Sequence, residues 1–391
     1  MYSERLLRIV LCSVCLLILC GESFAYNETN HSDESQNDST IFLDKVINLA
    51  EGIMQALTIE PNSGRWSLAT YPAASYGHRT GFEIGIMPLL RIKSSKNLPA
   101  SSITPAFLIS TKRMWEVQCD MEIYPSSWLT INAKTEWMRL PDEYYGKASK
   151  DGKIRAKMLT RTLVFDNQFY FGSNHFRIGP ALHYYYASFS EIDSVDYNFL
   201  SASNELRAAN GHNLGFGVAF RVDTRDNNEW PSCGFLLQGE ISGWHGDKGF
   251  FTGNIDWRTY HHISLAESVI ATQLSYGCAI SNTPLFLLLT VGGTRRDRAV
   301  NHNLKYINDM TWLFQAEWRI PLFWRLGATI WGGGGNDFGC DYPQPFKDSH
   351  AMAGLGLRLK IFPKSGLNMR LDAGIGSHGD HAIYLNIREA F

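Results

Sequence analysis

The stretch from Thr311 to Ile320, TWLFQAEWRI, alternates between apolar and polar side chains. Its apolar positions are Trp312, Phe314, Ala316, Trp318 and Ile320, and its polar positions include Thr311, Gln315, Glu317 and Arg319. Because successive side chains of a β-strand point to opposite faces, the pattern predicts a strand with one apolar and one charged wall. An apolar wall with two tryptophans suits lipid, so the stretch indicates a transmembrane β-barrel with a polar lumen.

The same alternation recurs along the chain from residue 65 in segments of about ten residues, the length that a tilted strand needs to cross a bilayer. Examples are 81–86, 215–223, 354–361, 367–375 and 383–388. We count roughly sixteen such strands, an even number as single-chain barrels require. A sandwich in water would show the same alternation, but so many two-faced strands favour closure on a lumen. We therefore expect an all-β fold, a closed antiparallel barrel over 65–391.

The connections alternate between tight and long ones. The tight ones are rich in Pro, Ser or Gly and lie at 125–127, 172–174, 321–323 and 363–366. The long polar ones lie at 140–157, 190–211, 280–309 and 336–349. Outer-membrane barrels have short periplasmic turns and longer extracellular loops, so the long connections are expected at one end of the barrel.

The N-terminal part reads as three short regions. Residues 1–25 carry two arginines, an apolar run and a small-residue site at Ser23-Phe24-Ala25, which predicts a signal peptide. Residues 26–40 are polar and are expected to form a disordered linker. Residues 41–64 repeat apolar side chains at helical spacing and predict a short amphipathic helix, packed on the barrel rim or lying as a plug or lid on the membrane.

Composition narrows the function classes. The formal net charge of -2 gives no reason to expect a nucleic-acid partner. Aromatic residues make up 13 % of the chain, which fits the aromatic girdles of a membrane barrel. The four cysteines beyond the leader (Cys119, Cys233, Cys278 and Cys340) are widely spaced. Isolated thiols are therefore expected, and neither a metal site nor a disulfide framework.

A polar turn motif, Asp223-Thr224-Arg225-Asp226-Asn227, lies between two predicted strands and is followed by Pro231 and Gly234. Short Asx side chains can bond the turn backbone, and Pro and Gly favour turn dihedrals. A cluster of Asp and Arg could also serve a metal or a catalytic site. The turn interpretation is favoured, because the acids and the arginines can neutralise one another.

The long connection at 280–309 contains the pair Gly292-Gly293, followed by Arg298. Glu317 lies on the polar face of the strand that follows, so it is the first candidate partner for Arg298. The alternative is an arginine in a mixed ion network, since Arg295, Arg296 and Asp297 are adjacent. An arginine–carboxylate pair in a confined lumen contributes roughly 1.5–3 kcal/mol.

The last predicted strand reads YLNIREAF and ends on an aromatic residue, Phe391. Tyr384, Leu385 and Ile387 continue the alternation towards it, and Glu389 interrupts the pattern. An edge strand with alternating apolar anchors can add to another sheet.

Together these three motifs resemble the BamA/TamA-like superfamily of outer-membrane proteins, the bacterial surface antigen family. The resemblance is to short Bacteroidetes-type members without periplasmic repeat domains. It implies that 280–309 is the sixth extracellular loop, which folds into the lumen, and that Arg298 occupies the position of the motif arginine. Here Ala299 and Val300 stand where the family has glycine and an aromatic residue. It also implies that the C-terminal residues are the signal by which the barrel-assembly machinery recognises a client.

The resemblance implies residence in the outer membrane of a Gram-negative bacterium, with outer-membrane lipids and periplasmic or outer-membrane subunits as partners. The implied function is to assist protein insertion, secretion or lipid movement through a lateral seam. The alternative is a passive or gated pore with a charged lumen; its cations would be Arg319, Arg358, Arg370 and Arg388. No catalytic motif and no Ser/His pair is identifiable. An enzyme is therefore not expected, nor is a cofactor.

Overall fold

A computed structural model describes the chain from Gly52 onward, with gaps at 53–56, 60, 62–63, 78, 96–97, 150–151, 174, 195–198, 294, 301–304 and 363–366. The predicted signal peptide and linker lie outside the described residues, as does most of the helix predicted for 41–64. Gly52 and Leu57 are helical. Thr58–Ile59, which the prediction also placed in the helix, is instead a short strand, β1, and pairs with β2.

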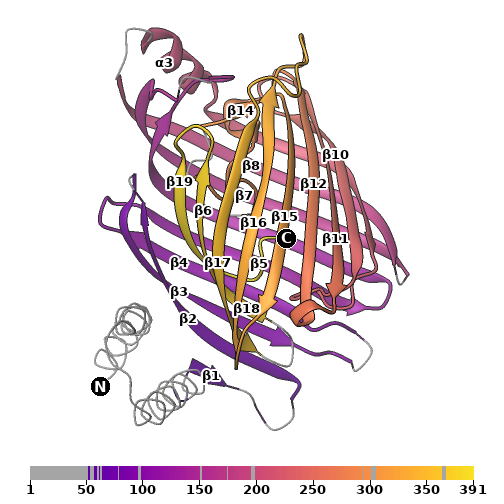
Figure 1. The fold of residues 1–391 in the computed structure, drawn as a ribbon. Coiled ribbons are helices and arrows are strands. Elements are labelled where there is room, and N and C mark those ends of the chain that lie inside the picture. The colour runs from indigo at the N-terminus through magenta and orange to yellow at the C-terminus, as the bar shows by residue number, and fades with distance from the viewer. Residues whose placement is uncertain are drawn as a thin grey trace, which may run out of the picture.

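The fold is one large antiparallel sheet of 17 strands (Figure 1). Since β1 has only 2 residues, sixteen long strands remain, as the alternation predicted. They are β2 (Trp66–Gly77), β3 (Gly81–Ile92), β4 (Ser101–Ser110), β5 (Trp115–Ser126), β6 (Leu129–Tyr144), β7 (Ala156–Ser173), β8 (Phe176–Ser194), β9 (Gly211–Asp223), β10 (Gly234–His245), β11 (Phe250–Ile263), β12 (Ser268–Ser281), β15 (Met310–Pro321), β16 (Leu326–Phe338), β17 (His350–Phe362), β18 (Leu367–Gly376) and β19 (His381–Ile387).

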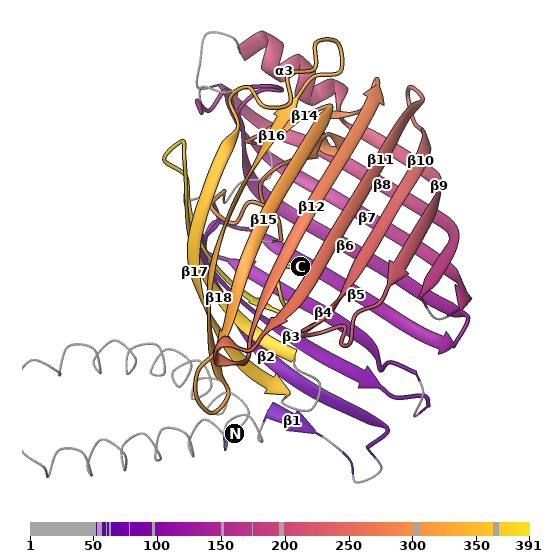
Figure 2. The ribbon, with the colours of Figure 1, turned by 45° about the vertical axis from the view of Figure 1, so that its right-hand side comes forward.

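Each long strand pairs with the next along the chain, so the sheet is a meander of hairpins. The sheet curves round, and β15 and β17 face β4 to β7 across its interior (Figure 2). Strands β19 and β2 lie beside each other. In the described part of the chain no run of paired residues joins these two strands, and we call this position the seam.

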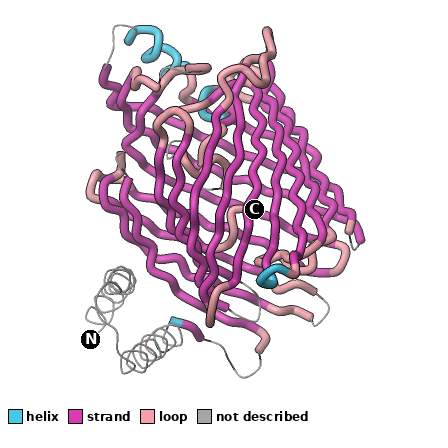
Figure 3. The backbone as a smooth tube through the Cα atoms, in the orientation of Figure 1, coloured by secondary structure: helices cyan, strands magenta, loops and turns pink. Residues whose placement is uncertain are grey.

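The long connections leave the sheet at one end, which carries helix α3 (Phe199–Ala208) and is called the α3 end (Figures 1 and 3). These connections follow β6, β8, β12 and β16, as expected from their length and polarity. Helix α3 lies within 190–211, which the sequence analysis predicted only as a long polar connection. The connections at the other end include the 3-10 turn η1 (Leu265–Glu267). No helix in the described residues is long and apolar enough to cross a bilayer.

The two faces of the sheet differ as the alternation predicts. On β3, Phe82, Ile84 and Ile86 point outward and are 49 %, 43 % and 42 % exposed. On β15, Phe314 is exposed on the outer face, whereas Gln315, Glu317 and Arg319 are buried inside. The apolar surface therefore lies outside, and many charged side chains face the interior. This arrangement is the reverse of a water-soluble sandwich, whose apolar faces meet in a core.

Candidate functional site

The connection between β12 and β15, residues 282–309, folds into the interior and is called the inner loop. It contains the turn η2 (Leu285–Leu287) and two short paired strands, β13 (Leu289–Thr290) and β14 (Ile307–Asn308). Four of its buried apolar side chains cluster with residues of β15, β16 and β17, while Leu285, Leu288 and Ile307 belong to a second cluster with β6, β7, β8 and α3. The first cluster consists of Val291, Ala299, Val300, Tyr306, Leu313, Trp331 and Met352.

The pair Gly292-Gly293 begins the turn that presents Arg298. Gly292 forms an isolated bridge with Asp297, and the Gly293 amide donates to the carbonyl oxygen of Asp297 at 3.2 Å. Gly293 has a φ of 131°, a conformation that side chains with a Cβ rarely adopt. The glycine therefore allows the chain to reverse just before Arg298.

Arg298 is fully buried and connects the inner loop to two strands of the sheet. Its Nη1 donates to Glu317 Oε2 of β15 at 2.7 Å and to Asp372 Oδ2 of β18 at 3.2 Å. Its Nη2 donates to Gln315 Oε1 at 3.4 Å. The structure thus brings together the two residues that the sequence paired, Arg298 and Glu317, and adds Asp372 as a second acid. Asp337, the acid of the intervening strand β16, instead accepts from Asn308 at 3.3 Å.

Further arginines surround the same acids and form what we call the interior ion network. Arg319 Nε donates to Glu317 Oε1 at 2.9 Å. Arg358 donates to Glu317 at 3.3 Å, to Asp372 at 2.8 Å and to Glu389 at 2.8 Å. Its members are Arg298, Arg319, Arg358, Arg370, Glu317, Asp372 and Glu389, each with a side chain at most 3 % exposed. A buried charge is stable only beside an opposite charge. The interior ion network therefore holds the inner loop in one position.

Trp331 of β16 forms the apolar support of Arg298. The guanidinium carbon lies 4.1 Å from the centre of the indole ring. The ring fits into a slot in β17 and β18, because a Cβ built on Gly354 would lie 2.1 Å from Trp331 and one on Gly374 would lie 2.5 Å away. The glycines therefore allow the ring to pack under the arginine.

We expect Gly354→Val to displace Trp331 and to destabilise the folded protein by about 1–3 kcal/mol, the usual effect of overpacking. The measurement is the heat-unfolding temperature in detergent. Gly339→Val is the control, since a Cβ there would meet nothing nearer than 3.8 Å. Equal unfolding temperatures for the two variants would contradict the packing of Trp331 against Gly354.

Asp297 precedes Arg298 and pairs with no guanidinium in the described residues. Burial raises the pKa of Asp297 to about 6, although its carboxylate accepts a hydrogen bond from the amide of Ala299 at 2.9 Å. The folded chain therefore binds the Asp297 proton more tightly than the unfolded chain, so ionisation of this group opposes folding. This loss of stability develops as the pH rises from about 4 to about 6.

Asp297→Asn is expected to stabilise the folded protein by roughly 1–3 kcal/mol at pH 7.5 and to have little effect at pH 4. Asparagine keeps the acceptor for the Ala299 amide and removes the buried charge. The check is the difference in unfolding temperature between variant and wild type at the two pH values. A difference that is the same at both would show that the charge is not the cause.

The C-terminal residues differ from the expectation of a strand that runs to the end. β19 ends at Ile387, and Glu389, Ala390 and Phe391 are buried in the interior. Glu389, which interrupts the alternation, accepts from Arg358 and, at 3.0 Å, from Asn368. The main-chain oxygen of Phe391 accepts from Arg319 Nη2 at 2.8 Å.

Other residues of the predicted assembly signal also lie near the inner loop. Tyr384 points inward, and its hydroxyl donates to the carbonyl oxygen of Val300 at 2.8 Å. Leu385 is partly exposed. In the folded chain Tyr384 therefore binds the inner loop, and Phe391 binds Arg319 of β15. Recognition of the segment by an assembly machinery remains a prediction.

The turn motif between β9 and β10 is held by internal bonds. Arg225 binds the carboxylate of Asp223 through Nε at 2.9 Å and Nη2 at 2.8 Å, and Arg221 adds a bond of 2.7 Å. Asp226 accepts from the Ser232 amide at 2.9 Å. Pro231 is buried, and Gly234 has a φ of 92°. The acids are thus neutralised by arginines and amides, as the turn interpretation expects.

A serine–histidine contact that the sequence did not reveal lies on β8 and β10. Ser242 Oγ is 3.3 Å from His183 Nε2, and His183 Nδ1 is 2.8 Å from Asp166 Oδ1. Glu240, however, lies 2.7 Å from the same Nε2 and accepts from Ser242 Oγ at 2.6 Å. A carboxylate on each ring nitrogen suits the doubly protonated imidazolium, which cannot accept the serine proton. The group is therefore an ion cluster and not an activated nucleophile.

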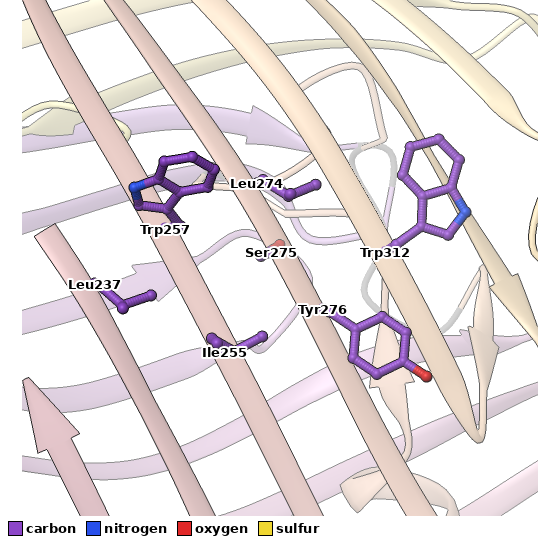
Figure 4. A pocket seen from close by; sticks show the side chains of 7 residues that line it. All are labelled: Leu237, Ile255, Trp257, Leu274, Ser275, Tyr276 and Trp312. Carbon is purple, nitrogen blue, oxygen red and sulfur yellow. The ribbon is translucent and has the colours of Figure 1, made fainter. Parts of the chain in front are cut away.

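Two further features lie outside the interior ion network. An apolar groove on the outer face lies between Trp257 and Trp312 (Figure 4). The four cysteines Cys119, Cys233, Cys278 and Cys340 are free thiols. In the described part of the chain no group of three or more His, Cys, Asp or Glu residues is arranged to hold a metal ion.

Comparison with known proteins gives a likeness in fold. No family model matches the chain. No curated protein matches its sequence. Among solved structures, BamA from Haemophilus ducreyi lacking POTRA domains 1-3 superimposes with a TM-score of 0.51 at 14 % identity, over 83 % of this chain and 69 % of that one. CdiB from Acinetobacter baumannii also gives 0.51 at 11 % identity, over 82 % of this chain and 59 % of that one. The chain therefore has the fold of these outer-membrane β-barrels.

Proposed function

We propose that the chain is an integral outer-membrane β-barrel of the BamA/TamA-like type, resident in a Gram-negative bacterium, that assists protein insertion, secretion or lipid movement. The observation that carries the proposal is the inner loop, fixed to the interior wall by Arg298, Glu317 and Asp372. A plain pore has no need of such a brace, since sixteen strands already enclose a channel. The likeness in fold to BamA and CdiB supports it.

The mechanism depends on the seam between β2 and β19. We infer that the barrel closes there and that the seam is its weakest contact, because every other neighbouring pair of long strands has a ladder of paired residues. Two strands that separate at the seam expose unpaired backbone groups, which an incoming strand can pair with. The braced loop would keep the remaining wall rigid while the seam opens. The protein itself would reach the membrane as a client of the assembly machinery.

The test is a pull-down of the tagged protein from native outer membrane, followed by its depletion from cells. The proposal expects other barrels, or outer-leaflet lipids, to fall in amount at the outer membrane after depletion. Re-expression of the wild type should restore them. If neither changes while small solutes enter more slowly, the function is that of a pore.

The pore is the second candidate, and the charged interior favours it. Side chains of β5 and β6, among them Glu116, Asp120 and Glu136, face the interior opposite the basic residues of β15 to β18. Acids on one wall and arginines on the other would give a passage a transverse field. The inner loop lies between the two walls, and its effect on conductance decides between the candidates.

A further inference from the structure

Two arginines lie directly opposite each other on the outer face of the sheet. In the ladder of β6 and β7, Arg139 pairs with Arg161, and in that of β5 and β6, Trp115 pairs with Arg139. Both arginines share the outward parity of Trp137 and Phe165, which are 55 % and 38 % exposed. Like charges on directly opposite positions destabilise a strand pair. An anion bound between the two guanidinium groups would relieve this repulsion.

Within the described residues no carboxylate pairs with Arg139 or Arg161. In the part of the chain that the structure describes, Arg139 Nη1 donates to the carbonyl oxygen of Arg113 at 3.0 Å, and Arg161 forms no hydrogen bond or ion pair. Arg113, which supplies this carbonyl oxygen, has a φ of 64° in the turn between β4 and β5. We call Arg139 and Arg161 the outer basic patch. Further along β6, Glu143 is paired in the ladder with a different cation, Lys157.

The outer basic patch borders the apolar surface. Trp115 and Trp137 form an edge-to-face pair with ring centres 4.6 Å apart. Ile109 and Val117, beside them, are 59 % and 37 % exposed. An aromatic band next to arginines marks the level where hydrocarbon gives way to headgroups. An arginine that faces lipid destabilises a barrel by several kcal/mol at the bilayer midplane and by almost nothing near the interface. The outer basic patch is therefore expected to lie at the interface.

We propose that the outer basic patch binds the phosphate groups of an anionic glycolipid in the outer leaflet. The proposal rests on the membrane-spanning barrel proposed above, with the α3 end outside. Trp115 begins β5 and Arg139 lies near the end of β6, so the patch is at the α3 end. The planar fork of arginine matches two phosphate oxygens at once. The exposed Ile109, Val117 and Trp137 lie where the acyl chains of such a lipid would run.

The test uses the full chain folded in detergent and titrated with a phosphorylated outer-leaflet glycolipid. The readout is the glycolipid concentration that gives half the maximal rise in heat-unfolding temperature. In the variant with both Arg139→Gln and Arg161→Gln this concentration should increase about tenfold or more. The matched control is Lys347→Gln, a cation in the exposed loop after β16 at the same end, and it should titrate like the wild type.

Two ligand arms identify the source of the phosphate. The dephosphorylated glycolipid and inorganic phosphate should each leave the unfolding temperature unchanged. A double variant that titrates like the wild type, or equal responses to the two glycolipids, overturns the proposal. A response to inorganic phosphate equal to that to the lipid also overturns it, because the acyl chains would then have no part.

Flotation with lipid vesicles separates this proposal from the one on which it rests. Wild type and double variant should both float with the vesicles, and both should show the compact, heat-sensitive band of a folded barrel on gels. A wild-type protein that stays in the aqueous fraction without detergent would contradict the membrane-spanning barrel. If both proteins float but respond equally to the glycolipid, only the proposed lipid site is contradicted.

Discussion

Glu317→Ala is expected to destabilise the folded protein by about 3–5 kcal/mol, the usual effect of removing one partner of a buried ion pair. Three guanidinium groups donate to this carboxylate, from Arg298 at 2.7 Å, Arg319 at 2.9 Å and Arg358 at 3.3 Å. Without it they would lie buried around a void. The unfolding temperature in detergent should fall by roughly 5–10 °C.

Three comparisons make this result specific. Glu317→Gln keeps an acceptor without the charge and should lie between alanine and wild type. Arg298→Ala should cost less, because Arg319 and Arg358 still neutralise Glu317, but it should release the inner loop to proteases. Glu267→Ala removes a paired carboxylate that is 79 % exposed and should change almost nothing. A Glu317→Ala protein that unfolds with the wild type would contradict the interior ion network.

The pairing of Arg298 with Glu317 could be predicted because a strand's side-chain period is 2. Once Trp312 and Phe314 are assigned to the outside, Glu317 must face inward, and the loop arginine lies only 19 residues before it. Asp372 has the same inward parity on β18, but it lies 74 residues from Arg298. Periodicity tells which way such a side chain points. It does not tell which strand the loop will reach.

Features that depend on a break in the pattern could not be predicted. Glu389 looked like an interruption of the last strand, and it is instead the residue that turns into the interior to meet Arg358 and Asn368. The contact of Ser242 with His183 joins residues 59 positions apart, with no local signal to connect them. Alternation thus predicts faces and strands, while contacts across the interior follow from the curvature of the whole sheet.

Replacing residues 292–300 of the inner loop by a short Gly/Ser linker is expected to raise single-channel conductance about tenfold or more. A sixteen-stranded barrel with an unfilled interior leaves an aqueous channel. In this chain the interior holds Val291, Arg298, Ala299 and Val300, each at most 1 % exposed. The wild type should therefore give small, infrequent steps in a planar bilayer, and the loop-replaced variant large and steady ones.

The control is replacement of the exposed turn 246–249 at the same end by Gly/Ser residues, which should leave the small steps unchanged. If the wild type already conducts as much as the loop-replaced variant, the inner loop does not occlude the interior and the pore becomes the better account. If the wild type is nearly closed and the loop-replaced variant is open, a passive channel is excluded as the resting state. Any cargo must then displace the loop or pass through the seam. Because Glu317 holds the loop through Arg298, substitution of Glu317 should lower the unfolding temperature and raise the single-channel conductance together.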